Sequence, residues 1–338
     1  MKLAIHNGIS WNIKWIEYCK KNKIPVEVVN CYDTNIINLL KQKGITHLMW
    51  HFSHNFPKDI LMARNVLFSA AKMGIKTFPD FDTCWHFDDK ISQKYILEAV
   101  DAPLVPSYAF YNKKEAIDWL KNEARYSLVA KLRRGAGSYN VRLLKNYSQA
   151  RKYTCKMFGK GTHSTPGYLA DVKTKYKVAG NLKGIIKRLK KAPNFFRVMY
   201  AGKKALPKEK GYVYFQDFVP DNMYDVRIAI VGNHIWGFKR KVRDNDFRAS
   251  GSGMLDYSLE DIPLKIIKDL FLISKSLNTQ SVAYDLVKDK LDHYYIVEIS
   301  YCYMGEVIYN SPGYWDENLN FVKGHFIPEH IILENFIR

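Results

Sequence analysis

Residues 281–300 have the sequence Ser-Val-Ala-Tyr-Asp-Leu-Val-Lys-Asp-Lys-Leu-Asp-His-Tyr-Tyr-Ile-Val-Glu-Ile-Ser, which is the most informative stretch of the chain. Two runs of β-branched and aromatic residues flank a polar turn, which is the pattern of an antiparallel hairpin. If the turn is centred on residues 291–292, Asp285 lies opposite Glu298, and residues that lie opposite each other point to the same face. Ser300, two residues further along, shares that face.

Asp285, Glu298 and Ser300 would bring two carboxylates and a hydroxyl to one face of this hairpin. Two carboxylates this close repel each other unless a cation lies between them, and a set of oxygen ligands suits Mg²⁺. The hairpin therefore predicts a magnesium site. In the alternative interpretation, Asp285 and Glu298 face solvent from an edge hairpin and bind nothing.

The composition is that of a folded protein with more than one domain. The 338 residues suffice for two or three domains, and 47% of them are hydrophobic, which excludes a disordered chain. No apolar run approaches the roughly 20 residues that a membrane span needs, so we expect no transmembrane segment. The five cysteines lack the spacing of a disulfide framework or a zinc site, which predicts a reduced, cytoplasmic protein.

The net charge of +19 is concentrated in one segment. Residues 151–210 contain 17 Lys or Arg residues against two acidic residues, a net charge of +15. Such a segment attracts an anionic partner, for which nucleic acid, an acidic membrane surface and a polyanionic substrate are the candidates. The alternative is a solvated insertion in a Lys-rich chain, with no partner of its own.

The first 80 residues alternate between strand and helix patterns. Buried strands and intervening helices are expected, in chain order, at 2–6, 11–22, 26–31, 33–43, 45–52 and 57–74. This alternation predicts a small parallel sheet covered on both faces. His51, Ser53 and His54 follow the third strand, where open α/β sheets bind ligands. They are candidates for substrate contact, with a purely structural role as the alternative.

A glycine-containing loop follows a strand predicted at 127–132. The loop includes Gly135, Gly137 and Ser138, and the strand delivers Lys131 into it. Glycine lets the backbone approach a ligand closely, and consecutive N–H groups in such a turn bind anions. Because Lys131 adds a charge that suits phosphate, these residues predict a phosphate site. A hairpin tip without a ligand is the alternative.

Strand patterns return after residue 211 and lead back to the hairpin. Strands are expected at 212–219, 225–231 and 234–240, and a helix at 260–277. Asp225 and Arg227 share one face of the middle strand, because alternate residues of a strand point the same way. Arg240 follows from the next strand, and Arg248 lies in a basic loop beyond it.

In this order, the pieces resemble the ATP-grasp ligases, most closely the branch that contains glutathione synthetase and the RimK-type glutamate ligases. The resemblance covers residues 81–300, with 150–211 as a basic insertion. Its motifs are Lys90 at a helix start, Lys131 before the glycine loop, Gln216-Asp-Phe-Val219, Asp225-x-Arg227, Phe247-Arg-x-Ser250, Asp285-Leu and Glu298-Ile-Ser300. The implied fold is α/β (α+β), with an N-terminal domain over 1–80 and two ATP-grasp subdomains over 81–211 and 212–338.

The resemblance implies that ATP lies between the two subdomains and gives each motif a role. The nucleotide-binding residues would be Lys90, Lys131, Gly135, Gly137, Ser138, Gln216, Asp217, Phe218, Val219 and Asp225. The ligands of two Mg²⁺ ions, or of Mn²⁺, would be Asp285, Glu298 and Ser300. The catalytic residues would be Arg227, Arg240 and Arg248, of which Arg227 and Arg248 would stabilise the transferred phosphoryl group and the acyl phosphate.

Three positions depart from the family pattern. Asp217 stands where members usually have Glu, and Ser250 and Ser300 stand where they usually have Asn. Serine offers one oxygen with a shorter reach, so a water could complete the coordination of the second Mg²⁺. The departures bear on metal affinity, whereas the retained lysines, carboxylates and Arg227 favour an active enzyme.

The implied function is ATP-dependent ligation of a carboxylate to an amine through an acyl phosphate, with release of ADP. The basic segment favours an anionic substrate, such as an acidic surface-polysaccharide precursor or a peptide, and amidation of a uronic acid is the preferred candidate. The alternatives are a phosphotransferase acting on an anionic polyol and a nucleotide-binding scaffold with little activity. Nucleic acid is the less favoured partner, and the oligomeric state stays open, with a homodimer as one option.

Overall fold

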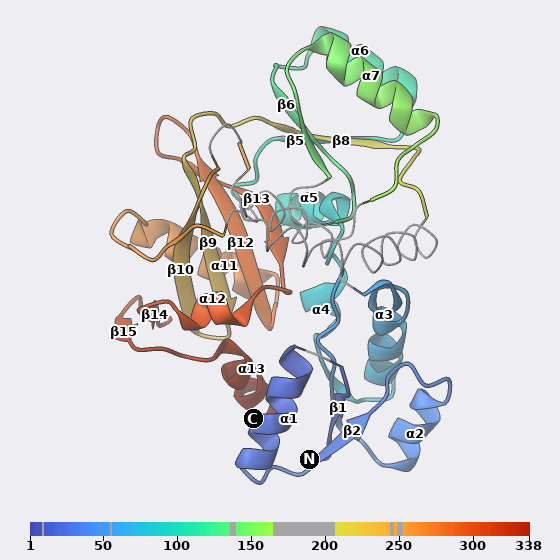
Figure 1. Cartoon of the computed structure of the whole chain (residues 1–338), viewed down its shortest axis with the longest axis vertical. Coiled ribbons are helices and arrows are strands. Elements are labelled where there is room, and N and C mark those ends of the chain that lie inside the picture. Colours follow the sequence, from blue (N-terminus) through green and yellow to red (C-terminus); the bar gives the residue numbers. More distant parts are fainter. Residues whose placement is uncertain (9, 55, 136–139, 165–206, 244–246, 249–252) are drawn as a thin grey trace, which may run out of the picture.

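A computed structural model describes residues 1–8, 10–54, 56–135, 140–164, 207–243, 247–248 and 253–338. Gly137, Ser138, Ser250 and most of the basic segment lie outside the described residues. The described chain forms three sheets with helices packed on them, with the N-terminal sheet at the bottom of Figure 1, the largest sheet at the left and the third at the top. The predicted α/β fold class is confirmed. Among the described helices, none combines the length and the apolar character needed to cross a bilayer.

The N-terminal sheet is parallel, as predicted, with the strand order β2-β1-β3-β4. Its elements are β1 (Leu3–His6), α1 (Trp11–Lys21), β2 (Val26–Val29), α2 (Ile36–Gln42), β3 (His47–Met49), α3 (Pro57–Lys72) and β4 (Lys76–Phe78). Strand β4 was not predicted from the sequence. The carboxyl ends of β1 and β3 are neighbours, and the chain after β3 continues into the loop of His51, Ser53 and His54.

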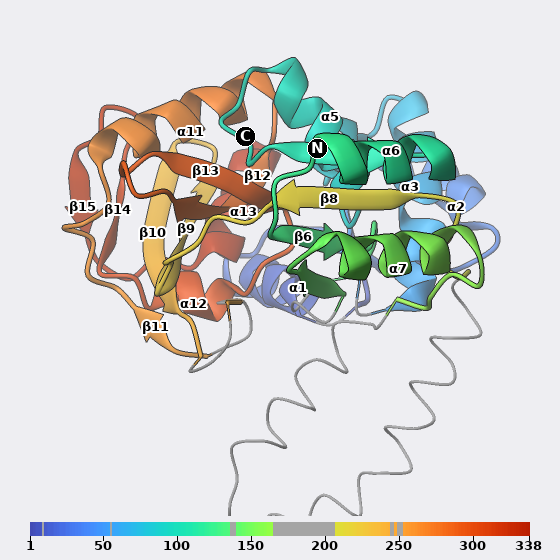
Figure 2. The ribbon, with the colours of Figure 1, turned by 90° about the horizontal axis from the view of Figure 1, so that it is seen from above.

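The upper sheet has the order β5-β8-β6-β7, and two helices cover one of its faces (Figure 1). Its elements, with the two helices that precede them, are α4 (Phe81–Cys84), α5 (Lys90–Ala99), β5 (Ser107–Phe110), α6 (Lys113–Asn122), β6 (Leu128–Lys131), β7 (Val141–Leu144), α7 (Tyr147–Phe158) and β8 (Val213–Asp217). Figure 2 shows α6 and α7 side by side above β8. Buried residues of both helices, such as Leu120 and Met157, pack on Phe215 of β8.

Two boundaries expected from the sequence require correction. The basic insertion was expected to begin at residue 150, but residues 147–158 form helix α7, whose apolar side belongs to the core. The strand expected at the start of the C-terminal subdomain is β8, which pairs with both β5 and β6 in the upper sheet. Chain order therefore differs from spatial order, because β8 returns to the upper sheet after the long insertion.

The largest sheet contains the decisive hairpin and has the order β13-β12-β9-β10-β14-β15, with β11 paired to β10. Its strands and associated helices are β9 (Tyr224–Val231), β10 (His234–Lys241), β11 (Leu255–Asp256), α11 (Leu264–Ser276), β12 (Ser281–Lys288), β13 (Tyr294–Ser300), α12 (Gly305–Tyr309), β14 (Gly313–Trp315), β15 (Phe321–Lys323) and α13 (Pro328–Ile337). The predicted pairing of the two hairpin strands is confirmed.

The two faces of this sheet bury different partners. One face, which includes Ile228 and Tyr284, packs against α11 through residues such as Ile267. The other face, which includes Ala229, shares a core with Trp15 of α1 and with residues of the N-terminal sheet and α13. Because side chains alternate along a strand, Asp285 belongs to this second face, two residues beyond Ala283.

We expect Ile267→Ala to lower the free energy of unfolding by about 2–5 kcal/mol, because it leaves a cavity in a closed core. Ile267 is fully buried on α11 (0% exposed), whereas Leu272 on the same helix is 55% exposed. The matched control Leu272→Ala should change stability by less than about 0.5 kcal/mol. Urea denaturation followed by circular dichroism measures both. Equal effects of the two substitutions would contradict the packing described for α11.

Candidate active site

Asp285 lies at the centre of a charged cluster on the largest sheet. It is paired in register with Glu298 of β13 on one side and with Arg227 of β9 on the other. Arg240 of β10 lies opposite Asp225 of β9. The predicted opposition of Asp285 and Glu298 is thus confirmed. The solvent-facing alternative is wrong for Asp285, because β12 is an inner strand and Asp285 is only 8% exposed.

A continuous chain of ion pairs links four of these side chains. Arg227 donates from Nε and Nη2 to the two oxygens of Asp285, at 2.6 and 2.8 Å. Arg240 reaches Asp285 Oδ2 with Nη2, at 2.8 Å, and donates from Nε to Asp225 at 2.7 Å. Burial alone would raise the pKa of Asp285, but the two guanidinium groups outweigh burial and hold that pKa well below its ordinary value. Asp285 is therefore ionised throughout the physiological range.

Lys90 and Lys131 enter the cluster from a different part of the chain. Lys90, the first residue of α5, lies 3.1 Å from Glu298 Oε1 and donates to the carbonyl of Gly135 at 2.9 Å. Lys131, the last residue of β6, donates to the carbonyl of Val297 at 3.0 Å. Both lysines are almost fully buried, at 3% and 7% exposed. Lys90 and Lys131 therefore both contact β13, the strand that carries Glu298.

The two lysines differ in their protonation chemistry. Burial lowers the pKa of Lys131 to about 8, although the charge of Glu298 opposes this effect. Burial also acts on Lys90, but Glu298 and Asp88 outweigh it and raise the pKa of Lys90. The difference follows from the contacts, because the amine of Lys131 bonds to a neutral carbonyl whereas Lys90 is directly paired with a carboxylate.

The start of α5 holds the glycine loop in place. The side chain of Asp88 accepts a hydrogen bond from the Gly135 N–H at 2.7 Å, and Asp89, the N-cap of α5, accepts one from Arg133 Nε at 2.7 Å. Gly135 has a φ of +102°, which residues with a side chain rarely adopt. Asp88 and Arg133 were missed in the sequence; a signal for Asp88 was the pair of acidic residues before the helix.

Gln216 lies on the same side of the upper sheet as Lys131. Its amide donates to Ser107 Oγ and Tyr214 Oη, both at 3.0 Å, and approaches the Val297 carbonyl at 3.5 Å. Ser107 and Tyr214 were not predicted. The antiparallel pairing of β5 with β8, which sets Ser107 opposite Gln216, is the feature that brings Ser107 to the site.

Three other residues of the expected nucleotide set lie further from this cluster. Asp217 is next to Gln216 in the strand, so its side chain points to the opposite face, where it lies near the Tyr108 hydroxyl at 3.5 Å. Phe218 packs edge-on against Phe247, with ring centroids 5.7 Å apart. Val219 accepts a hydrogen bond through its carbonyl from Asn222 at 3.2 Å.

The remaining expected site residues are Ser300 and Arg248. Ser300 Oγ donates to the Cys302 carbonyl at 3.0 Å and accepts from the Cys302 N–H at 3.1 Å, which stabilises the turn after β13. One lone pair of that oxygen is left for a ligand. Arg248 lies over the ring of Phe247, at 5.8 Å from its centroid.

The loop of the N-terminal sheet reaches the same region. The carbonyl of Phe52 accepts a hydrogen bond from Tyr301, the residue after Ser300. His51 stacks on Trp11 with ring centroids 4.1 Å apart, and burial lowers its pKa to about 3, so its imidazole is neutral near pH 7. His54 is close enough to Lys90 and Glu298 for their charges to act on its pKa, which burial lowers. His54 of this loop therefore lies within range of the charged cluster.

The carboxylates of Asp285 and Glu298 fit a magnesium ion whose other ligands would be water and a phosphate. Asp285 and Glu298 provide oxygens from adjacent strands, which suits Mg²⁺. Within the described part of the chain, no three His, Cys, Asp or Glu residues are grouped so as to hold a metal on their own. Mg²⁺ normally keeps several waters and binds through one or two carboxylates plus substrate phosphates, so a pair of carboxylates is sufficient. The number of ions stays a prediction.

We expect the ligand-free protein to become more stable as the pH rises from about 8 to about 10.4, through Lys131. Its pKa of about 8 in the folded protein lies below the value of about 10.4 for an unfolded lysine. In this window the unfolded state binds more protons, so the free energy of unfolding increases with pH. Urea denaturation at pH 7.5 and 10 should show that Lys131→Met removes roughly 2–3 kcal/mol of this increase. Lys94→Met, which removes a lysine paired with Glu98, should leave this increase intact. An equal dependence of the free energy of unfolding on pH in the two variants would contradict the lowered pKa of Lys131.

No family model matches the chain, and no curated protein sequence matches it. Solved structures do share its fold. The biotin carboxylase domain of 2-oxoglutarate carboxylase from Hydrogenobacter thermophilus, solved with MgADP and bicarbonate, is 12% identical with a TM-score of 0.57, over 98% of this chain and 68% of that one.

Two further structures match over nearly the full length of both chains. D-cycloserine synthetase is 13% identical with a TM-score of 0.56, over 99% of this chain and 100% of that one. D-alanine–D-alanine ligase from Bacillus anthracis is 13% identical with a TM-score of 0.53, over 100% and 98%. All three are ATP-grasp proteins, and identities this low concern the fold alone. The chain has the ATP-grasp fold, which confirms that part of the resemblance seen in its sequence.

Proposed function

We propose that the protein is an ATP-dependent ligase that joins a carboxylate to an amine through an acyl phosphate. One observation carries the proposal: Lys90 and Lys131 of the upper part of the molecule converge on the strand of Glu298, beside Asp285 and its two arginines. Phosphoryl transfer depends mainly on positioning and on cations around developing negative charge. The cluster supplies such cations in a largely buried setting.

The proposed reaction balances without a protein nucleophile. An oxygen of the substrate carboxylate attacks the γ-phosphorus of ATP, and ADP leaves. The amine then attacks the acyl carbon, the C–O bond to phosphate breaks, and inorganic phosphate leaves as the amide forms. Mg²⁺ held by Asp285 and Glu298 would neutralise charge on the phosphate oxygens.

Within this reaction, the chain's own cations change partners. In the structure, the amines of Lys90 and Lys131 donate to the carbonyls of Gly135 and Val297. A phosphate oxygen is a stronger acceptor than a carbonyl, because it is charged. Arg227 and Arg240 now neutralise Asp285. If Mg²⁺ takes over that carboxylate, the guanidinium groups become available to the transferred phosphoryl group.

The charge of the chain supports an anionic substrate, though not its identity. A net charge of +19, most of it in residues 151–210, favours substrates with several negative charges. A uronic acid in a surface-polysaccharide precursor is our preferred carboxylate, and a peptide is the second candidate. Both fit a ligase, because each presents a carboxylate that would be activated by conversion to an acyl phosphate.

We expect Mg²⁺ with ATP, at about 100 times the dissociation constant, to raise the melting temperature by roughly 5 °C. Lys131→Met and Glu298→Gln should each remove most of this shift, because one loses a phosphate contact and the other a metal ligand. Lys94→Met on α5 serves as the matched control and should retain the shift. Differential scanning fluorimetry with and without EDTA makes the measurement. A shift that survives in Lys131→Met would place the nucleotide elsewhere.

The reaction type has its own expected outcome. Release of ADP and phosphate should require a carboxylate and an amine together, tested with panels of uronic acids, peptides and amino acids. With hydroxylamine as the amine, the product should be a hydroxamate, which reports the acyl phosphate. If γ-³²P from ATP instead ended in a stable ester of a polyol hydroxyl, the protein would be a phosphotransferase. Nucleotide binding without any turnover across the panels would favour the scaffold.

A further inference from the structure

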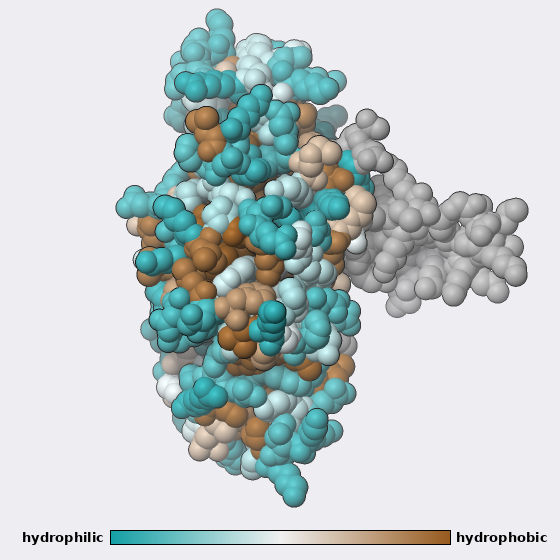
Figure 3. Space-filling view, turned by 90° about the vertical axis from the view of Figure 1, so that its left-hand side faces the viewer, coloured by the Kyte–Doolittle hydropathy of each residue, from teal (hydrophilic) through white to brown (hydrophobic). Residues whose placement is uncertain are grey.

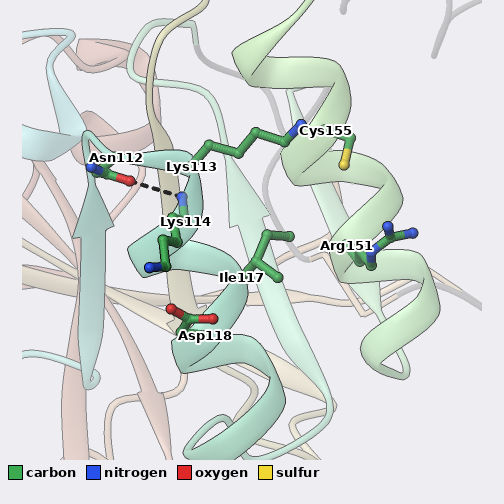
Figure 4. A pocket seen from close by; sticks show the side chains of 7 residues that line it. All are labelled: Asn112, Lys113, Lys114, Ile117, Asp118, Arg151 and Cys155. Carbon is green, nitrogen blue, oxygen red and sulfur yellow. Dashed lines mark hydrogen bonds between the residues drawn. The ribbon is translucent and has the colours of Figure 1, made fainter.

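A groove runs between α6 and α7 on the outer side of the upper sheet (Figure 4). One part of it is an open depression of about 530 Å³, lined by Lys113, Lys114, Ile117, Asp118, Arg151 and Cys155. A second part of about 550 Å³ shares Arg151 and Cys155 and extends along α7 to Tyr147. Figure 4 shows Lys113 extending from α6 toward Cys155 on α7. The two hollows adjoin at Arg151 and Cys155, and the second is lined by residues of α7 alone.

The groove carries an unbalanced positive charge. Lys113, Lys114, Arg151 and Lys152 line it, and Asp118 is its single carboxylate. None of the four cations has an ion pair within the described residues, whereas other lysines, such as Lys94, pair with an acid four residues further along. The top of the molecule, where α6 and α7 lie in Figure 1, is predominantly hydrophilic in the view of Figure 3.

The position of two of these lysines is unfavourable for the helix that carries them. Lys113 and Lys114 are the first two residues of α6, where the helix dipole disfavours a cation by about 0.3–1 kcal/mol each. Asn112 caps the helix by accepting from the Lys114 and Glu115 N–H groups, which offsets part of this cost. Helix stability therefore does not explain the two lysines.

The groove is separate from the nucleotide site. Residues of β6 and β8 alternate between the two faces of the upper sheet, so that Ala130 and Phe215 pack under α6 and α7 while Lys131 and Gln216 face the charged cluster. The groove is defined by α6 and α7 alone.

We propose that this groove binds a linear carboxylated polymer, specifically an anionic polysaccharide. Lysine and arginine side chains spaced along a groove suit repeated carboxylates, each contact being weak and the sum being sensitive to salt. A single-stranded nucleic acid fits less well, because such sites stack bases on several aromatic side chains and Tyr147 is the single aromatic residue of the lining. The choice of polysaccharide rests on the proposed function, since the ligase would act on a carboxylate. A chain held in the groove would keep substrate near the enzyme between turnovers.

The test is binding of fluorescently labelled polygalacturonate, measured by anisotropy at about 50 mM and about 200 mM NaCl. The groove variant combines Lys113→Glu, Lys114→Glu and Arg151→Glu. Its matched control combines Lys20→Glu, Lys41→Glu and Lys72→Glu, which reverse three exposed lysines on helices of the N-terminal sheet. Both variants change the net charge equally. We expect the groove variant to bind at least roughly tenfold more weakly than the control, with a shallower dependence on salt.

Equal weakening in both variants would overturn the proposal, because it would assign the binding to overall charge. Oligo(dT) binding that is as tight as polygalacturonate binding, and equally dependent on the groove, would overturn the choice of polysaccharide. If the triple reversal fails to fold, Lys113→Gln with Lys114→Gln and Arg151→Gln should still weaken binding about threefold. The thermal shift with Mg²⁺ and ATP should persist in the groove variants. If the wild type itself shows no thermal shift with Mg²⁺ and ATP, that result would count against the ligase and not against the groove.

Discussion

Asp285 is a buried carboxylate whose charge is balanced by Arg227 and Arg240, and the rest of the site depends on this balance. An unpaired charge in this position would cost several kcal/mol. The balance requires the strand order β13-β12-β9-β10, because each arginine comes from a different strand. A slip of one residue in β12 would turn Asp285 toward α11 and place Tyr284 in the site. The register that packs the core is therefore also the register that assembles the charges.

The molecule separates two kinds of positive charge. In the charged cluster, Lys90 and Lys131 are buried and held by specific acceptors, so their positions are fixed before a ligand arrives. On the opposite face of the upper sheet, the cations between α6 and α7 are exposed and unpaired within the described chain. Fixed charges suit recognition of one phosphate group, whereas exposed charges spaced along a surface suit a repeating polymer.

Local patterns were sufficient to predict much of the fold and part of the site. Alternation in residues 281–300 predicted the hairpin and the pairing of Asp285 with Glu298, because both are set by a short-range turn. Helix α7 was missed, since its Lys and Arg residues obscured an apolar side formed by every third or fourth residue. The contact of Arg240 with Asp285 could not be predicted, because it depends on which strands become neighbours across the sheet. The proposed roles of these residues stay predictions.

The N-terminal sheet and the largest sheet share one core, which affects how the protein unfolds. Leu3 near one end of the chain and Phe336 near the other are buried in the same cluster, together with Val231 from the middle of the largest sheet. The first 80 residues therefore share part of their core with the largest sheet and with α13. They should melt in one cooperative transition with the C-terminal helix, while the upper sheet has a core of its own, closed by α6 and α7.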